Sequence, residues 1–298
     1  MNLCQLLNRR TTIDVSIAYV QLFPVRVLLA LIPFTFISRI LSLVIHEVIG
    51  HAWVSRWFGS AANSFYVAPG VVGYASWHNP EGVTLLQRNI ISVGGSASGM
   101  VFGLGLFLLA VLLARRSPHW IHGMLAIGGA LSFGNDAAYL LISPLIEWGD
   151  GYSLLNNGVP PYAFVLFGLI SMTFLLGYMI PTAVNLLSSY YAVSSFWRVW
   201  AIFISVMIAP YIYEFPKAYF FFQEHFSRKI IYLGLTVFLS PIISFVAYKS
   251  PIISRARHAS TTREMPAAGV LLIWSIAIFM EIGFTAYFGL NMEMKPLF

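Results

Sequence analysis

Charged residues are scarce in this chain of 298 residues: Asp, Glu, Lys and Arg make up 9% of it, whereas 58% of the residues are hydrophobic. The mean hydropathy is correspondingly high, at +0.78. A typical soluble domain carries about 25% charged residues. The scarcity of charge therefore excludes an ordinary soluble domain and indicates a protein that crosses the lipid bilayer several times.

Cysteine is also nearly absent, since Cys4 is the only one. A single cysteine excludes an internal disulfide and a cysteine-rich metal site. The net charge of +6 does not indicate a nucleic-acid partner, because the 17 Lys and Arg residues fall mostly in short loops between apolar runs. That distribution is typical of a membrane topology signal. Residues 1–14 are mixed polar and do not resemble a cleavable signal peptide.

Three ionisable residues stand together near the end of a long apolar run, in the stretch IHEVIGHAWVSRWFG. They are His46, Glu47 and His51. A charged side chain costs about 2.5–3.5 kcal/mol or more at the bilayer centre, so such a cluster needs a compensating partner. Two imidazoles and a carboxylate predict a divalent metal ion.

The spacing of the two histidines departs from the zinc motif H-E-x-x-H by one residue, because position 50 is Gly50 and the second histidine is His51. At roughly 100° per residue, a separation of five turns an α-helix about 140° past a full turn. A regular helix therefore cannot direct both side chains at one metal ion. A π-bulge, which inserts one residue into a turn, would restore the alignment, and we predict one at Gly50.

The motif H-E-x-x-G-H resembles the expanded motif of dipeptidyl peptidase III, in which two histidines at this longer spacing bind zinc. A wider resemblance is to the site-2 protease class of intramembrane zinc metalloproteases. It depends on the motif helix, the AWVSRWFG that follows, and the later Gly149-Asp150-Gly151. The resemblance implies that His46, His51 and Asp150 hold Zn²⁺ and that Glu47 is the general base.

Two aspartates are candidates for the third metal ligand, Asp150 and Asp136. Site-2 proteases have the pattern N-x-x-P-x-x-x-x-D-G, which SPLIEWGDG resembles in its second half, but Pro144 precedes Asp150 by six residues where the pattern has five. The asparagine of the pattern is missing, and Asn135 is a candidate stand-in. Asp136 lies deeper in its apolar segment and is the alternative ligand.

The expected fold is an all-α polytopic membrane protein of about seven transmembrane helices, with a short β-hairpin or re-entrant element within residues 60–88. We divide the chain into an N-terminal interfacial segment (1–25), a metalloprotease-like membrane core (26–160) and C-terminal transmembrane helices (161–298). In site-2 proteases a β-element after the motif helix positions the substrate, and a plain surface hairpin is the alternative here. Gly95, Gly99 and Gly103 recur every fourth residue, which predicts close packing against the motif helix.

These patterns favour an intramembrane zinc endopeptidase, in a multi-pass protein of the cell membrane, that hydrolyses transmembrane or membrane-associated proteins. Because of the longer histidine spacing, a catalytically inactive scaffold or complex subunit with the same fold stays open. A membrane-bound metal-dependent oxygenase is less favoured, because the seven histidines of the chain are too scattered. The membrane orientation also stays open, since it depends on the number of spans before His46.

Overall fold

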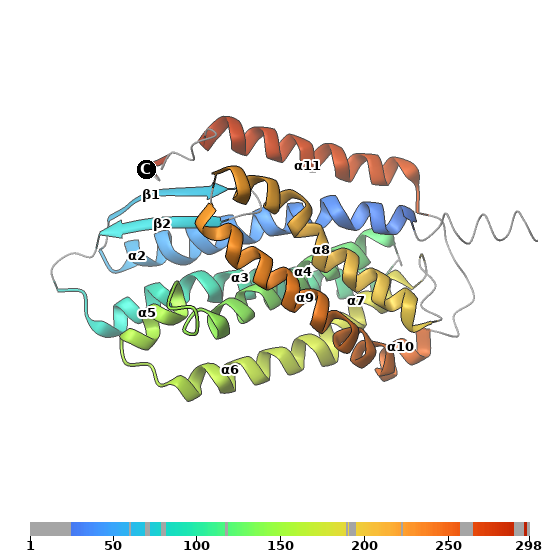
Figure 1. The fold of residues 1–298 in the computed structure, drawn as a ribbon, viewed down its shortest axis with the longest axis horizontal. Helices are drawn as coiled ribbons and strands as arrows, with labels where there is room; N and C mark the ends of the chain where they lie inside the picture. Colours follow the sequence, from blue (N-terminus) through green and yellow to red (C-terminus); the bar gives the residue numbers. More distant parts are fainter. Residues whose placement is uncertain are drawn as a thin grey trace, which may run out of the picture.

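The computed structural model describes residues 25–59, 61–68, 72–78, 82–116, 119–188, 190, 195–221, 223–256, 265–288 and 295–296. The expected interfacial segment, residues 1–25, lies almost entirely outside these ranges. The described part is mostly helical, as predicted, with one small β-sheet. Its helices run roughly along one long axis, which suits a bundle that crosses a membrane (Figure 1).

Five of the described helices are long and apolar enough to cross a bilayer, which indicates a multi-pass membrane protein. They are Val25–Trp57, α3 (Leu85–Arg116), α4 (Trp120–Ile142), Pro161–Leu187 and α11 (Ala267–Phe288). The expected count of about seven also included α8 (Phe196–Phe221) and α9 (Gln223–Lys249). Within the described residues, those two helices hold only shorter apolar stretches, Phe196–Ala209 and Val237–Lys249, so the count of seven is not confirmed.

The helix that carries the histidine motif, called the motif helix below, runs without interruption from Val25 to Trp57. Its middle part, η1 (Ile45–Trp53), is a π-helix, and α2 (Val54–Trp57) completes it. The predicted widening around Gly50 is therefore confirmed, and it extends beyond a single bulge. Pro33 lies within the helix without ending it.

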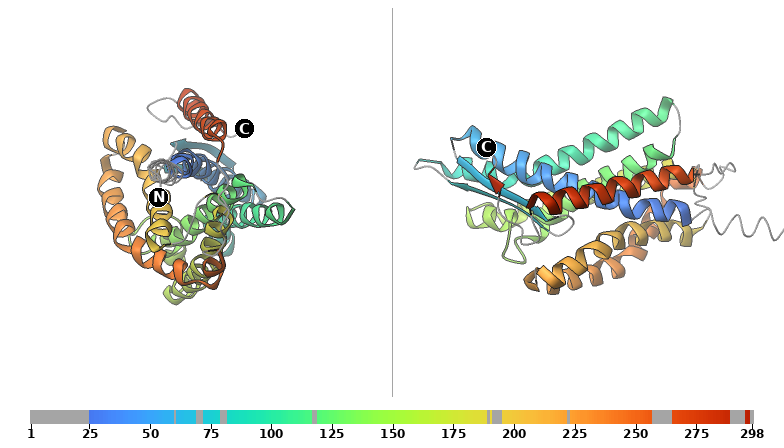
Figure 2. Two further views of the ribbon diagram at one scale, coloured as in Figure 1. Left: turned by 90° about the vertical axis from the view of Figure 1, so that its right-hand side faces the viewer. Right: turned by 90° about the horizontal axis from the view of Figure 1, so that it is seen from above.

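The predicted β-hairpin is present directly after the motif helix. Strand β1 (Ala61–Ala68) pairs antiparallel with β2 (Val72–His78), with an irregularity between Ala62 and Ser64. A short β3 (Lys295–Pro296) pairs with the other edge of β1, so the strand order is β2-β1-β3. Val67 of β1 is packed with Leu43 of the motif helix and Phe288 of α11. The hairpin thus lies along the C-terminal half of the motif helix (Figures 1 and 2).

The glycines of α3 allow close contact with two neighbouring helices. Gly95 faces the motif helix, where a Cβ would collide with His51 and lie 2.6 Å from His46 Nε2. Gly99 and Gly103 instead face α4: a Cβ on Gly103 would lie 2.5 Å from the backbone nitrogen of Phe133. The predicted close packing is present, but only Gly95 of the three packs against the motif helix as expected.

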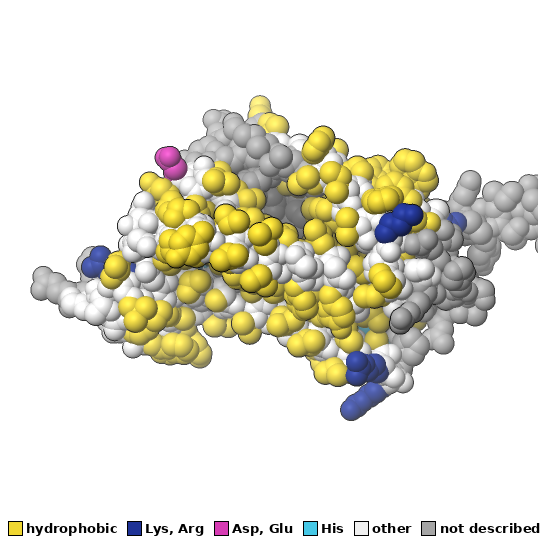
Figure 3. Space-filling view, turned by 90° about the horizontal axis from the view of Figure 1, so that it is seen from below, with side chains coloured by type: hydrophobic (Ala, Val, Ile, Leu, Met, Phe, Trp, Pro, Cys, Tyr) yellow, Lys and Arg dark blue, Asp and Glu magenta, His cyan; other side chains and the backbone are white. Residues whose placement is uncertain are grey.

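The second half of the chain packs against α4. The span Pro161–Leu187 consists of α6 (Pro161–Phe174), a π-helical turn η2 (Leu175–Met179) and α7 (Ile180–Leu187), and α10 (Pro251–Ala256) follows α9. One core cluster joins Val27 of the motif helix and Met124 of α4 with Met179 and Ile202. The face shown in Figure 3 is mostly hydrophobic, as a lipid-exposed surface requires.

The contact between α3 and α4 generates a matched test. Gly103→Leu would force a side chain against the α4 backbone, whereas Gly105 of the same helix has open space around its Cβ position. Overpacking costs typically 1–3 kcal/mol, so we expect Gly103→Leu to lower the melting temperature in detergent by several degrees. Gly105→Leu is the control and should melt like the parent protein. Equal melting temperatures for the two variants would contradict this packing.

Candidate metal centre

The π-helix places the two histidines of the motif on one side of the helix. Hydrogen bonds in a π-helix join residues five apart, so residues with that separation lie one turn above each other. His46 and His51 accordingly have ring centroids 5.0 Å apart in an edge-to-face arrangement. The extra residue in H-E-x-x-G-H therefore does not separate the imidazoles, because the backbone absorbs it.

Contacts with α3 accommodate the wider turn. A Cβ on Gly50 would lie 2.5 Å from the carbonyl oxygen of Gly94, so no larger residue fits there. The Ser98 hydroxyl lies 3.1 Å from the carbonyl oxygen of Ile45, where the π-helix begins, and 2.8 Å from that of Gly95. Ser98 thus provides a donor beside the first carbonyl of the widened segment. Glycine on both helices permits this close approach.

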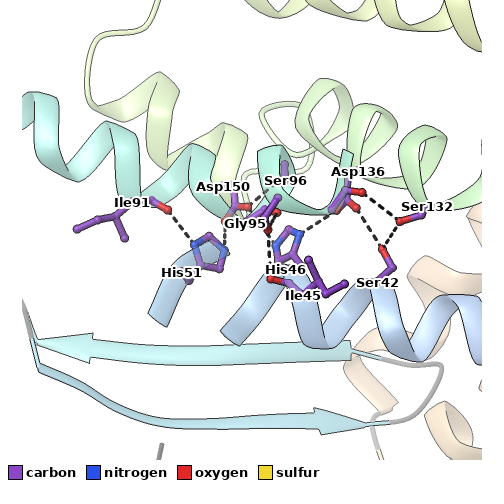
Figure 4. Close-up of polar contacts among 12 residues, drawn as sticks. Ser42, Ile45, His46, His51, Ile91, Gly95, Ser96, Ser132, Asp136 and Asp150 are labelled. Atoms are coloured by element: carbon purple, nitrogen blue, oxygen red, sulfur yellow. Dashed lines mark hydrogen bonds and ion pairs between the residues drawn. The ribbon is translucent and has the colours of Figure 1, made fainter. Parts of the chain in front are cut away.

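Three buried side chains meet at the motif: His46, His51 and Asp150 each offer an atom within 4.8 Å of the others. His46 Nε2 lies 3.3 Å from one Asp150 carboxylate oxygen, and His51 Nε2 lies 3.3 Å from the other (Figure 4). Nitrogen and oxygen ligands at about 2.0–2.1 Å from a tetrahedral ion are roughly 3.3 Å apart. His46, His51 and Asp150 could therefore hold a metal ion.

Asp150 reaches this position as the first residue of a short helix, α5 (Asp150–Asn156). Gly149 precedes it with a φ of +83°, a left-handed conformation that favours glycine. The backbone N–H of Gly151 donates to Ser143 Oγ at 2.8 Å, which ties the start of α5 to the end of α4. Pro144 comes two residues after α4 ends at Ile142.

The charge on Asp150 is stabilised by its partners. Burial alone would raise the pKa of this carboxyl, but the His51 and His46 imidazoles outweigh burial and hold the pKa of Asp150 well below its usual range. Ser96 of α3 adds a hydroxyl donor 3.3 Å from the carboxylate. The ionised form is the one that binds a metal ion.

Asp136 does not face the metal position. Its carboxylate accepts from Nδ1 of His46 at 2.8 Å, on the side of the ring opposite to Nε2. Nδ1 of His51 lies 2.9 Å from the carbonyl oxygen of Ile91 and donates to it. Nδ1 therefore carries a proton on both imidazoles, and each Nε2 faces Asp150, where it can bind a metal ion once it is deprotonated. Such partners orient metal-binding histidines in many proteins.

Two further serines complete the surroundings of Asp136. Ser42 donates to the second Asp136 oxygen at 3.3 Å, and Ser132 donates to Ser42 at 2.9 Å or to the carbonyl oxygen of Gly99 at 3.2 Å. Sequence reasoning did not identify these serines or Ser96. For two of them the sequence does hold a signal, which is their position. Ser42 precedes His46 by four residues and Ser132 precedes Asp136 by four, so each serine lies on the same helix face as that residue.

Glu47 is buried next to the first histidine, against the hairpin. A Cβ on Gly73 of β2 would lie 2.6 Å from Cγ and 2.8 Å from a carboxylate oxygen of Glu47. The missing side chain at Gly73 therefore leaves the room that Glu47 occupies. This contact places the hairpin strand β2 directly beside the predicted base.

Other polar residues of α4 and its start lie away from His46, His51 and Asp150. Asn135, the stand-in for the missing asparagine, is exposed on the outer face of α4. His119 and His122 contact each other at the start of α4, whereas Asp136 lies near its end. Among the residues that the structure describes, His46, His51 and Asp150 form the one group of three or more potential ligands.

These positions predict different metal behaviour for the two aspartates. Asp150→Ala removes a ligand and should leave the purified protein with little bound zinc after reconstitution. Asp136→Asn should still bind zinc at saturation but with a dissociation constant raised by about 10–100-fold, since it loses only the orienting partner of His46. Competition with a zinc-binding dye measures both effects, and Asn135→Ala is the control. Zinc loss in Asp136→Asn together with full zinc in Asp150→Ala would reverse the assignment.

Comparison of the chain with models of protein families, with curated proteins and with solved structures finds no match.

Proposed function

We propose that this protein is an intramembrane zinc-dependent peptidase. The observation that carries the proposal is the meeting of three buried residues: one Asp150 carboxylate oxygen lies 3.3 Å from Nε2 of His46 and the other lies 3.3 Å from Nε2 of His51. Glu47 adjoins the first of these histidines on an apolar helix. A set of two imidazoles and one carboxylate is common at catalytic zinc sites, which leave a fourth position open. Zn²⁺ is therefore the metal that suits this ligand set best.

The chain's own residues have distinct tasks in peptide hydrolysis. Bound zinc lowers the pKa of a coordinated water toward neutrality and polarises the carbonyl of the peptide bond. Glu47 accepts the proton of the attacking water and delivers it to the leaving amine. Asp136 and the Ile91 carbonyl hold His46 and His51 in the required tautomers. The apolar bundle keeps bulk water away from these groups, which strengthens their electrostatic interactions.

The hairpin supports a peptide substrate. In the described sheet β2 has β1 on one side, so its other edge carries unpaired backbone groups. An extended peptide can add to such an edge by backbone hydrogen bonds. Because Gly73 of β2 adjoins Glu47, a peptide on this edge would pass close to the predicted base. The substrate class is therefore a transmembrane or membrane-associated protein that is locally extended.

Removal of the base tests the reaction directly. Glu47→Gln should lower the rate of cleavage of a membrane-embedded reporter protein by about 10²–10⁴-fold, because an amide cannot accept the proton from water. Bound zinc should stay close to that of the parent, since Glu47 is not among the three ligands. The measurements are cleavage in proteoliposomes and zinc content, with exposed Glu147→Gln as the control. A parent protein that holds no zinc after reconstitution would favour the inactive scaffold instead.

The contact between the hairpin and the base gives a second test. Gly73→Ala would place a methyl group against Glu47, so Glu47 must move. We expect a lower rate constant for cleavage with unchanged zinc content. Tyr74→Ala, at an exposed position in the same strand, is the control for a general effect on the hairpin. Activity of Gly73→Ala equal to that of the parent would show that the close approach of β2 does not matter.

A further inference from the structure

Tyr139 of α4 lies beside the candidate metal ligands, and the proposed reaction assigns it no task. It follows Asp136 by three residues, so the two side chains leave α4 on the same face. Its ring contacts the His46 imidazole edge to face, with the ring centroids 5.8 Å apart and the ring planes at 66°. The imidazole is thus held by Asp136 through a hydrogen bond and by Tyr139 through packing.

The hydroxyl end of Tyr139 lies against the backbone that leads into α5. A Cβ on Gly149 would lie 2.7 Å from Cζ and 3.1 Å from Cε2 of Tyr139, and it would collide with the hydroxyl. The backbone N–H of Asp150 faces the hydroxyl oxygen within hydrogen-bonding reach. One phenol therefore contacts His46 with its ring and the start of α5 with its oxygen.

The start of α5 needs partners from outside the helix. The first N–H groups of a helix have no acceptor within it, and the residue before α5 is Gly149, which has no side chain to cap them. Hydroxyls at the end of α4 accept instead: Ser143 Oγ accepts from the N–H of Gly151 at 2.8 Å, and Tyr139 faces the N–H of Asp150. Because α5 has only seven residues, the position of Asp150 depends on these contacts.

We propose that Tyr139 is a positioning residue of the metal centre, which holds His46 and Asp150 at the separation that a shared ion requires. The two ligands belong to different elements, the motif helix and α5, and one oxygen of Asp150 lies 3.3 Å from His46 Nε2 (Figure 4). Tyr139 contacts both elements at the point where they meet. The inference depends on the candidate metal centre, on which the proposed peptidase function also rests, but not on peptide hydrolysis itself.

The hydroxyl is the informative part of the side chain. Phenylalanine at position 139 would keep the ring contacts with His46 and with Trp148, whose ring centroid lies 6.2 Å away. It would remove only the acceptor that faces the N–H of Asp150. An N–H group without an acceptor is costly inside an apolar bundle, so the start of α5 should shift toward another acceptor. Tyr139→Phe therefore separates the placement of Asp150 from the packing of the ring.

Metal binding by the purified full chain tests this role. Tyr139→Phe should raise the dissociation constant for Zn²⁺ by about tenfold, the low end of the effect of an outer partner of a metal ligand. It should also change the visible absorption of bound Co²⁺, which reports the geometry of the ligands and which a merely structural role would leave unchanged. Tyr139→Leu loses the ring contact as well and should weaken Zn²⁺ binding further. Tyr162→Phe, at a position that is 67% exposed, is the control and should bind both ions like the parent.

The possible outcomes separate this role from the peptidase function. Zinc affinity and cobalt absorption of Tyr139→Phe equal to those of the parent would overturn the inference and leave the three ligands in place. Equal weakening in Tyr139→Phe and Tyr162→Phe would also overturn it, since the two tyrosines would then act alike. A parent protein that binds neither ion would overturn it together with the metal centre. The expected effects in a parent that binds zinc but cleaves no reporter would support the role of Tyr139 and count against the peptidase function alone.

Discussion

The five-residue separation of His46 and His51 is the constraint on which the rest of the site depends. An α-helix cannot bring both imidazoles to one point at this spacing, so the backbone adopts a π-helix from Ile45 to Trp53. A wider turn needs space and a partner for its displaced carbonyls. Glycines at 50, 94 and 95 provide the space, and the Ser98 hydroxyl lies beside the first carbonyl.

Burial in an apolar bundle makes the hydrogen bonds around the centre as important as the three ligand atoms. An unpaired polar group inside a membrane protein costs several kcal/mol, and a charged one costs more. Nδ1 of His46 has Asp136 and Nδ1 of His51 has the Ile91 carbonyl, while Ser42 and Ser96 donate to the two aspartates. Nε2 of His46, Nε2 of His51 and the Asp150 carboxylate face one another, and a cation could bind between them.

Sequence reasoning succeeded where a local rule applied and failed where tertiary structure decided. The spacing of the motif predicted the widened turn, and a hairpin is present within residues 60–88, where a hairpin or a re-entrant element was expected. The resemblance favoured Asp150 over Asp136 as the third ligand, and packing shows that Asp150 approaches Nε2 of His46 whereas Asp136 approaches Nδ1. Asn135 was expected near the site but is exposed. Its neighbour Asp136 is buried, and consecutive residues of an α-helix point about 100° apart around the helix axis, so Asn135 points outward.

The room for the centre is made largely by missing side chains. A Cβ at Gly95 would meet both histidines, at Gly99 it would meet Asp136, and at Gly73 it would meet Glu47. A glycine inside a helix or strand costs roughly 0.5–1 kcal/mol relative to alanine. Two neighbouring elements, α3 and β2, therefore sacrifice some intrinsic stability around the site. An alanine at any of these three positions would collide with a residue of the candidate site, so close packing around the site requires glycine there.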